Sequence, residues 1–215
     1  MSFSPIPTTL KTDLAGLGTG VVLDLGCGDG RWTTSLRQHA PSVIALDKSQ
    51  ALAPAAEVVG DVISPPVQPH SCALVMAANL LRHLPNPHSA LTLWRSLLVP
   101  GGILWVFEDE PAADGEPGVL YRDLQQYLKK LNPRGRGALW PQVRFESMIV
   151  NEPGWLLDSF TNEEQLQDKA SLLLMLDQMV AHGDAEAARL ATGLRQRPFS
   201  YGRTWCARWT ERAGA

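Results

Sequence analysis

The sequence predicts an α/β protein built on a mostly parallel β-sheet. Between residues 21 and 110, short apolar runs alternate with amphipathic stretches of helix length, which is typical of strand–helix–strand units. The chain has 215 residues, a length that fits one domain, and we expect that domain to span 1–215. With 45% hydrophobic and 19% charged residues, the chain can form a large core, which excludes disorder as a description of the whole.

The first predicted unit is a strand, a tight turn, a helix and a second strand. The apolar run VVLDL at 21–25 predicts a strand that ends in a cluster of glycines. A helix is expected from Asp29 to His39, because Pro41 would stop it. The second strand is SVIALD at 42–47, which closes the first crossover unit.

The same alternation continues through three further strands. A short helix is expected around 49–54, followed by a third strand, AEVVGD, at 56–61. The run CALVMAA at 72–78 predicts a fourth strand, and apolar residues at helical spacing predict a helix over 88–98. A Pro-Gly-Gly turn then separates this helix from a fifth strand, ILWVFE, at 103–108.

Beyond residue 110 the alternation stops. Residues 119–131 carry a helical pattern, whereas 132–160 combine proline, glycine and aromatic residues without a clear period. We interpret 111–160 as an insertion. A long helical region interrupted by a glycine is expected at about 162–195, and its apolar residues between 172 and 179 are expected to form one buried face. Alternating side chains predict a closing strand at 202–210.

Charge argues against a nucleic-acid partner. The net charge is −3, and a groove that follows a phosphate backbone would normally leave a basic excess. The exception is the arginine-rich stretch 189–215, in which Glu211 is the one acidic residue. We interpret these arginines as solvated or strand-edge side chains, with an anionic-substrate patch as the alternative.

Cysteine usage and hydropathy place the chain in a reducing, aqueous compartment. Its three cysteines lie far apart and form no C-x-x-C pair, so neither a disulfide framework nor a metal site is expected. No apolar run approaches the ~18 residues that a membrane span requires. The N-terminal stretch lacks the basic segment and apolar core of a signal peptide. We therefore expect a cytoplasmic protein that does not bind membranes.

The glycine cluster DLGCGDG at 24–30 carries the strongest functional signal. Glycines between a strand and a helix let the backbone turn tightly and let a ligand approach the main chain. The second strand ends at Asp47, 21 residues after Gly26, where an acidic side chain suits the two hydroxyls of a ribose. The cluster lacks the G-x-G-x-x-G spacing of a dinucleotide site, and Asp24 would repel a pyrophosphate. It also lacks the G-K-[ST] of a P-loop. These features predict a nucleoside ligand without a phosphate chain and with a positive end near Asp24.

The stretch VLDLGCGDG resembles motif I of the class I S-adenosylmethionine-dependent methyltransferases, and the chain is similar to those that act on small molecules. Four later stretches follow in that family's order: IALDKS, GDV at 60–62, NLLRHLPNP, and LLVPGGILWVFE. The resemblance covers about 15–110. One departure is the fourth strand, which opens with Cys72-Ala73 where the family often has an acidic residue. The resemblance implies a Rossmann-like three-layer sandwich, with a seven-stranded, mostly parallel sheet and an antiparallel closing strand.

The resemblance implies that the glycine loop and the acid before it hold the amino-acid end of the cofactor, S-adenosyl-L-methionine. Gly26, Gly28 and Gly30, with Cys27 in the same loop, would let the backbone pass under the homocysteine part. Asp24 would balance the charge of its amino group, through water.

The resemblance also implies the residues that bind the nucleoside. Asp47 would bind the ribose hydroxyls, and Lys48 would lie along the adenine. Asp61 would accept a hydrogen bond from the adenine amino group, while Val62 would pack on the ring. The alternatives are a helix N-cap for Asp47 and a turn residue for Asp61.

The acceptor side is less defined, because methyl transfer is an in-line displacement in which positioning and exclusion of water can suffice. The resemblance places Ala78 and Asn79 beside the sulfonium. At the carboxyl edge of the sheet, His83 is a candidate general base, with a loop-fixing histidine as the alternative. The acidic run 108–110 lies on the same edge, with a solvated loop as the alternative.

In this family the substrate lid varies, so we expect 111–160 to form a lid. Core packing is the default for the aromatic residues of this region, and an acceptor-pocket wall is the alternative: Tyr121, Tyr127, Trp140 and Trp155. The sequence thus predicts an S-adenosylmethionine-dependent methyltransferase with a small-molecule acceptor. Two alternatives remain: a non-catalytic cofactor-binding or interaction protein of the same fold, and an RNA methyltransferase that uses the arginine-rich C-terminal region.

Overall fold

The fold is described from a computed structural model of the chain. The structure describes residues 6–48, 53–109, 116–131, 155–164, 169–196 and 203–211. Its contacts divide the chain into two compact units, a sheet unit that contains Pro5–Glu108 and Trp205–Ala215, and a helical unit that contains most of the residues between 109 and 204. We describe each unit separately.

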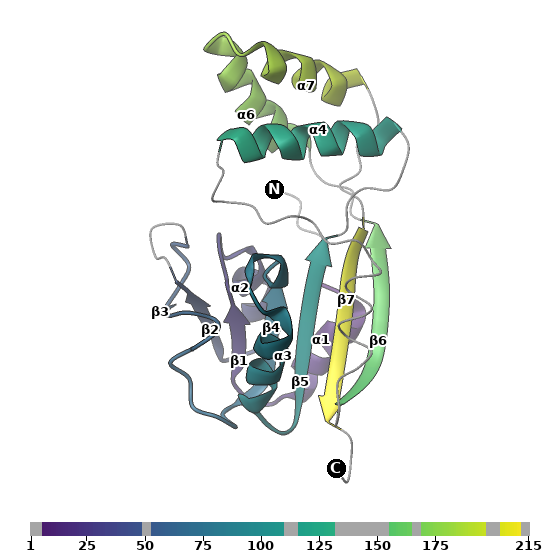
Figure 1. The fold of residues 1–215 in the computed structure, drawn as a ribbon. Coiled ribbons are helices and arrows are strands. Elements are labelled where there is room, and N and C mark those ends of the chain that lie inside the picture. Colours follow the sequence, from purple (N-terminus) through teal and green to yellow (C-terminus); the bar gives the residue numbers. More distant parts are fainter. Residues whose placement is uncertain are drawn as a thin grey trace. The chain divides into compact units, whose positions relative to one another are not determined.

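One seven-stranded sheet forms the centre of the fold, with the strand order β3-β2-β1-β4-β5-β7-β6 (Figure 1). Strand β1 pairs in parallel with β2 and β4, and the pairs β2–β3 and β4–β5 are also parallel. In Figure 1 the arrow of β7 points opposite to those of β5 and β6, as expected for an antiparallel closing strand. The strands are β1 (Val22–Leu25), β2 (Val43–Asp47), β3 (Val58–Val59), β4 (Cys72–Ala78), β5 (Leu98–Asp109), β6 (Trp155–Glu164) and β7 (Arg203–Glu211).

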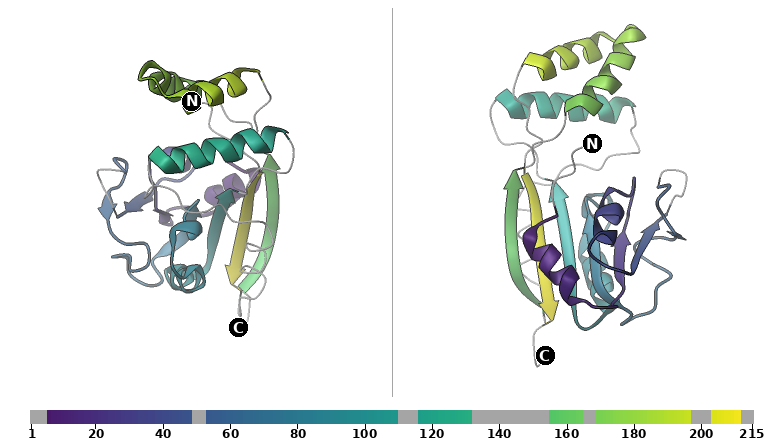
Figure 2. Two further views of the ribbon diagram at one scale, coloured as in Figure 1. Left: turned by 45° about the horizontal axis from the view of Figure 1, so that its top comes forward. Right: turned by 180° about the vertical axis from the view of Figure 1, so that it is seen from behind.

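Helices cover both faces of this sheet, which confirms the predicted Rossmann-like three-layer architecture. Helices α1 (Thr8–Gly16) and α2 (Arg31–Arg37) lie on one face, and α3 (Pro87–Ser96) lies on the other (Figures 1 and 2). A short 3₁₀-helix, η1 (Leu81–His83), follows β4. The apolar residues of α1 and α2 share one buried cluster with the sheet, in which Trp32, Trp105 and Phe107 stack.

Three segments differ from the sequence prediction. Helix α2 begins at Arg31, not Asp29, because Gly30 before it is left-handed with φ 77°. Strand β5 begins at Leu98, not 103, because the Pro-Gly-Gly segment bulges within the strand: Cys72 pairs with Leu98 and Leu74 with Ile103. The interpretation of the stretch around 155–164 as irregular chain followed by helix was wrong, because these residues form β6. The helix expected around 49–54 falls largely outside the described residues.

A buried ionic cluster joins α1 to β5 and β7. The Asp13 carboxylate accepts a hydrogen bond from Trp105 Nε1 at 2.8 Å. It also accepts two from Arg208, from Nε at 2.8 Å and from Nη2 at 2.9 Å. Both charged side chains are largely buried, at 9% and 17% exposed. Such a bidentate pair fixes the relative position of elements that are far apart in sequence.

The helical unit has its own core. It comprises α4 (Glu116–Leu131), α6 (Lys169–Ala181) and α7 (Ala185–Gln196). Leu124, Leu176 and Leu190 lie at its centre, and the other apolar residues of 172–179 that were expected to be buried pack around them. Leu174, outside that stripe, is 65% exposed. The predicted face therefore packs on this core, with Leu176 buried and Leu172, Leu173, Met175 and Met179 partly buried.

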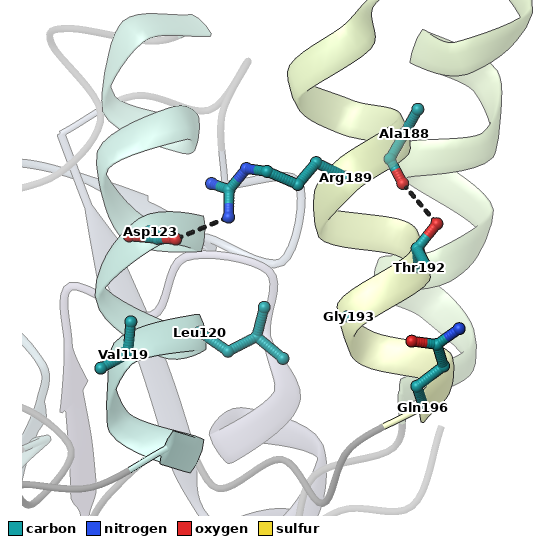
Figure 3. Close-up of a pocket in the computed structure, with 8 residues that line it drawn as sticks. All are labelled: Val119, Leu120, Asp123, Ala188, Arg189, Thr192, Gly193 and Gln196. Atoms are coloured by element: carbon teal, nitrogen blue, oxygen red, sulfur yellow. Dashed lines mark hydrogen bonds and ion pairs between the residues drawn. The ribbon is translucent and has the colours of Figure 1, made fainter.

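Two further contacts connect the helices of this unit. Tyr127 Oη donates to Asp184 Oδ2 at 2.9 Å, while Asp184 Oδ1 accepts from the Ala187 N–H and so caps α7. Between α4 and α7 lies a groove of about 450 Å³, which Arg189 spans to reach Asp123 (Figure 3). None of the helices in the described part of the chain is long and apolar enough to cross a membrane.

We expect the variant Asp13→Ala to lower the free energy of unfolding by about 2–4 kcal/mol, because it removes the carboxylate from a largely buried guanidinium. Chemical denaturation followed by circular dichroism measures this change. Arg37→Ala is the matched control in the same unit, since Arg37 forms an exposed pair with Glu57, whose loss should cost about 1 kcal/mol or less. Equal effects of the two variants would contradict the structural role of the Asp13 cluster.

Candidate functional site

The candidate site lies at the carboxyl edge of the parallel strands. From β1 the chain continues through β2 and β3 on one side, and then through β4 and β5 on the other. The sheet order therefore reverses between β1 and β4, which is where open α/β sheets bind their ligands. The loop after β1 and the loop after β4 border this point. Both loops belong to the sheet unit.

The glycine loop after β1 is held by main-chain hydrogen bonds. The Leu46 carbonyl oxygen accepts from the N–H groups of Gly26 at 2.8 Å and Cys27 at 3.1 Å, and Gly30 N donates to the Cys27 carbonyl at 2.9 Å. All three glycines have positive φ: 66° at Gly26, 53° at Gly28 and 77° at Gly30. L side chains rarely adopt this conformation, so the loop needs glycine there.

The space around the glycines separates their roles. A Cβ at Gly26 would lie 2.9 Å from Leu80 Cδ1, and a Cβ at Gly30 would lie 2.3 Å from Ala55 Cβ. Packing within the protein therefore leaves no room for a side chain at Gly30, whereas a Cβ at Gly26 would displace the end of the Leu80 side chain. At Gly28, by contrast, the nearest atom to such a Cβ would be the Gly26 carbonyl oxygen at 3.9 Å. Gly28 thus faces the open space that a ligand could occupy.

Asp24 is a buried carboxyl group directly below this loop. It is 1% exposed, and Thr33 Oγ1, from the first turn of α2, donates a hydrogen bond to its Oδ2 at 2.6 Å. Burial raises the pKa of Asp24 to about 6, and the nearby charge of Asp47 adds to that rise, whereas the Thr33 hydrogen bond opposes it. A cation bound nearby would favour the ionised form, so Asp24 fits the role of counter-ion.

Asp47 ends β2 and contacts the glycine loop. Its Oδ2 accepts from the Gly28 N–H at 3.1 Å, which brings the predicted ribose-binding acid next to the residue that faces open space. The alternative N-cap role concerns a helix outside the described residues. Lys48 follows directly and is exposed, so it is available to a ligand.

Asp61 and Val62, the other two residues predicted to contact the nucleoside, make contacts within the protein. Asp61 Oδ1 accepts from the Ile63 N–H at 3.1 Å, so Asp61 is a turn residue, while its exposed side chain leaves the adenine contact a prediction. Val62 is 7% exposed, and its carbonyl oxygen accepts from Trp94 Nε1 at 2.9 Å. Most of its surface thus packs against protein.

Cys27, also predicted to be in the loop, is buried. Burial raises the pKa of its thiol to about 12, and the charges of Asp24 and Asp47 act in the same direction. The thiol is therefore protonated at neutral pH. Cys27 can fill space in the loop but does not act as a nucleophile.

The loop after β4 forms the other border of the site. Ala78 ends the strand, and Asn79 has φ 55°, with its N–H donating to the Phe107 carbonyl oxygen at 2.7 Å. His83 lies at the end of η1 and is exposed, so its role as general base stays a prediction. Within the described residues, no group of three or more His, Cys, Asp or Glu side chains could hold a metal ion.

The acidic run 108–110 does not behave as one solvated segment. Glu108 is 2% exposed, and its Oε1 accepts from the Leu81 N–H at 2.7 Å, so a solvated position was wrong for this residue. The Asp109 side chain and Glu110 fall outside the described part of the chain.

The predicted pocket-wall aromatics are in part core residues. Tyr127 is buried in the helical unit, and burial and its hydrogen bond to Asp184 raise its pKa to about 12. Trp155 lies on β6, where the Arg95 guanidinium carbon is 5.3 Å from its ring centroid. The Tyr121 side chain and Trp140 lie outside the described residues.

Sequence reasoning missed Thr33 and Leu80, which shape the site, and it named Glu108 as a candidate at the carboxyl edge without predicting its burial. Thr33 orients Asp24, and Leu80 packs against Gly26. Thr33 lies in the first turn of the helix that follows the glycine cluster. This position is a weak indication that its side chain faces the first strand. Nothing in the sequence distinguishes Leu80 from its neighbours, and nothing in it indicates that Glu108 is buried.

Comparisons with known proteins agree with this geometry. Residues 23–106 match the family model of a methyltransferase domain. A crystal structure of a Bacillus halodurans protein assigned as a methyltransferase has a TM-score of 0.62 at 17% identity, covering 95% of this chain and 98% of that one. Residues 23–106 therefore carry a methyltransferase domain, and the motifs in this segment resemble those of the class I S-adenosylmethionine-dependent enzymes. This resemblance implies S-adenosylmethionine as the cofactor, and the open space at Gly28 beside Asp24 and Asp47 would fit it.

Curated relatives of the methyltransferase domain differ in their reactions. Carboxy-S-adenosyl-L-methionine synthase of Pseudomonas syringae pv. tomato is 31% identical over 52% of this chain and 54% of that protein. Ubiquinone biosynthesis O-methyltransferase of Xanthomonas campestris pv. campestris is 28% identical over 71% of this chain and 65% of that protein. The chain thus spans about half of the first relative and less than two thirds of the second.

We expect Asp47→Ala to weaken the binding of S-adenosylhomocysteine about 100-fold, through loss of charge-assisted hydrogen bonds to the ribose. Asp47→Asn keeps an oxygen for the Gly28 N–H and should weaken binding only about 10-fold. Gly28→Val should abolish binding, because the side chain fills the open space. Isothermal titration calorimetry measures all three.

Gly18→Val is the matched control for Gly28→Val. Gly18 has a similar φ of 58° and nothing within 4 Å of a Cβ position, but it lies in the turn after α1. Both variants carry the same backbone strain, and only Gly28→Val should lose the ligand. Unchanged affinity in both Asp47→Ala and Gly28→Val would show that the site lies elsewhere.

The raised pKa of Asp24 predicts two opposite pH trends. S-adenosylmethionine affinity should rise as pH increases from about 5 to 7, because the ionised carboxylate attracts the cationic ligand. The stability of the free protein should fall as pH rises from about 4 through 6, because the folded state binds the Asp24 proton more tightly than the unfolded state.

Titration calorimetry and chemical denaturation across this pH range measure the two trends. A shift from 3.8 to about 6 corresponds to about 3 kcal/mol of unfolding free energy. Asp24→Asn retains an oxygen for Thr33 and should flatten both curves. Wild-type curves that match those of Asp24→Asn would rule out titration of Asp24 in this range.

Proposed function

We propose that the chain transfers a methyl group from S-adenosylmethionine to a small-molecule acceptor. The observation that carries this proposal is the donor site itself: Gly28 faces open space, Asp47 lies in hydrogen-bond contact with its N–H, and Asp24 lies buried beneath the loop. A fold that served only as a scaffold would gain no stability from the buried, raised-pKa carboxyl group of Asp24. These groups therefore support ligand binding as the reason for their presence.

In the proposed reaction, an acceptor nucleophile would attack the electrophilic methyl carbon that S-adenosylmethionine supplies when bound, in line with the carbon–sulfur bond, and S-adenosylhomocysteine would leave with the electron pair of that bond. The chain's own residues orient this reaction. Asp47 holds the ribose, Asp24 balances the amino group, and the loop that begins at Asn79 borders the sulfonium. Such positioning can contribute most of the rate enhancement when the nucleophile is already reactive. His83 is the proposed base for an acceptor that must lose a proton.

Charge and one relative support a small acceptor over a polymer. The net charge of −3 does not favour a phosphate backbone. The name of the Xanthomonas relative describes an O-methyltransferase of ubiquinone biosynthesis. The name of the Pseudomonas relative, by contrast, describes synthesis of a carboxylated form of the cofactor. The same domain therefore serves different reactions, and the acceptor is decided by residues outside the donor site.

We further propose that the predicted lid region 111–160, apart from its last residues, which belong to β6 (Trp155–Glu164), closes over the acceptor, and that the protein works in the cytoplasm. A lid that excludes water would protect the methyl donor and strengthen local electrostatic interactions. Three buried cysteines that are free thiols support a reducing compartment.

We expect purified protein incubated with methyl-labelled S-adenosylmethionine and cell extract to label material below a few kilodaltons. Mass spectrometry before and after removal of larger material measures where the label goes. Asp47→Ala is the control and should give no label. Label found only in RNA would support the RNA methyltransferase alternative. Cofactor binding with no label in any fraction would support the non-catalytic alternative.

A further inference from the structure

Glu108 is a charged side chain buried at the carboxyl end of β5, where it is 2% exposed. A carboxylate in such a position is costly unless other groups hold it. Here its partners come from the loop after β4. Oε1 accepts from the Leu81 N–H at 2.7 Å, and Oε2 lies 3.8 Å from Arg82 Nε. The Arg82 side chain is itself only 11% exposed.

These contacts fix the start of η1. Leu81 and Arg82 are the first two residues of η1. The N–H at the start of such a short helix has no partner within the helix, and here the Glu108 carboxylate accepts from it. The same carboxylate also pairs with the Arg82 side chain. Glu108 is therefore bonded to backbone that is 27 residues away in sequence. A side chain held in this way cannot also reach out to take a proton from an acceptor.

A second anchor lies one residue earlier on the same strand. The Phe107 carbonyl oxygen accepts from the Asn79 N–H at 2.7 Å, and Asn79 has a left-handed φ of 55°. Consecutive residues of β5 thus hold the loop after β4 at Asn79 and at Leu81. The residue between the two anchors, Leu80, has little freedom to move.

Leu80 is the residue that connects this loop to the glycine loop. Its Cδ1 lies 2.9 Å from the position that a Cβ at Gly26 would take, so it packs directly on the Gly26 backbone. The β5 anchors therefore determine how the loop after β4 meets the loop after β1. These two loops border the point at which the sheet order reverses.

We propose that Glu108 is a positioning residue for the donor site, which holds the loop 79–83 against the glycine loop at the sulfonium end of the cofactor. This inference rests on the proposed function. Glu108 acts through Leu81, Leu80 and Gly26, and it touches neither the ribose nor the adenine side of the site. Loss of the Glu108 contacts should therefore disturb one end of the ligand and leave the other end bound.

Three probes distinguish the two ends: S-adenosylmethionine, S-adenosylhomocysteine and adenosine. Glu108→Ala should weaken the binding of the first two at least 10-fold, while adenosine binding changes less than 2-fold. Glu108→Gln retains an oxygen for the Leu81 N–H and should stay within about 3-fold of wild type for all three. Calorimetry measures the affinities, and hydrogen exchange at Leu81 should be faster in Glu108→Ala alone. Glu186→Ala, an exposed acid in the helical unit, is the control and should match wild type.

The outcomes separate this proposal from the proposed function. Failure of the wild-type protein to bind S-adenosylmethionine would refute the donor site as a whole. Wild-type binding, with Glu108→Ala equally affected for adenosine and for the two larger probes, would overturn the positioning role. Should Glu108→Ala not fold, Arg82→Met together with Glu108→Gln decides the question. Both variants keep the Leu81 bond and should bind all three probes, and a 10-fold loss of S-adenosylhomocysteine in either would overturn the role assigned to that bond.

Discussion

The parallel pairing of β1 with both β2 and β4 is the constraint on which the site depends. Parallel strands end at the same edge, so the residues that follow them converge without any contact in sequence. The glycine loop, Asp47 and Asn79 are brought together in this way. The Leu46 carbonyl oxygen then fixes the loop, because it accepts from both Gly26 and Cys27. The sheet topology thus brings these residues to one edge, and the local hydrogen bonds then fix the conformation of the loop.

Three buried carboxylates in the sheet unit are each satisfied in a different way. Asp13 pairs with Arg208 and the Trp105 indole, so its charge is matched within the protein. Glu108 is matched by a backbone N–H and a nearby arginine. Among the described residues, Asp24 accepts its side-chain hydrogen bond from the neutral Thr33 hydroxyl, and burial raises its pKa to about 6 although this hydrogen bond opposes the rise. The bonds of the first two hold elements of the fold together, whereas under the proposed function the charge of Asp24 would be matched by a ligand.

The sequence allowed prediction of those features that depend on local chemistry. The glycines, Asp24 and Asp47 stand at the ends of apolar runs, so their place at one edge follows from the strand pattern. Strand β6 could not be predicted, because its partner β7 lies about forty residues further along the chain and its own side chains do not alternate. The burial of Glu108 was equally hidden, since its partners Leu81 and Arg82 are found only when β4 and β5 are aligned. Gly26, Gly28 and Gly30 look equivalent in sequence. Only the structure shows that Gly26 and Gly30 lie against protein atoms, whereas Gly28 faces open space.

The positions of the charged groups in the proposed site affect how it would distinguish S-adenosylmethionine from S-adenosylhomocysteine. Both S-adenosylmethionine and S-adenosylhomocysteine keep the amino group and the ribose, so Asp24 and Asp47 would hold them with similar strength. Such uniform binding lowers the concentration at which the cofactor binds, but it does not favour the transfer step. The sulfonium charge and the methyl group are the parts that change, and in the proposed site the loop 79–83 would border them. Because Phe107 and Glu108 accept hydrogen bonds from that loop, changes at the end of β5 would, under the proposed function, affect the transfer step without altering the contact of Asp47 with the nucleoside.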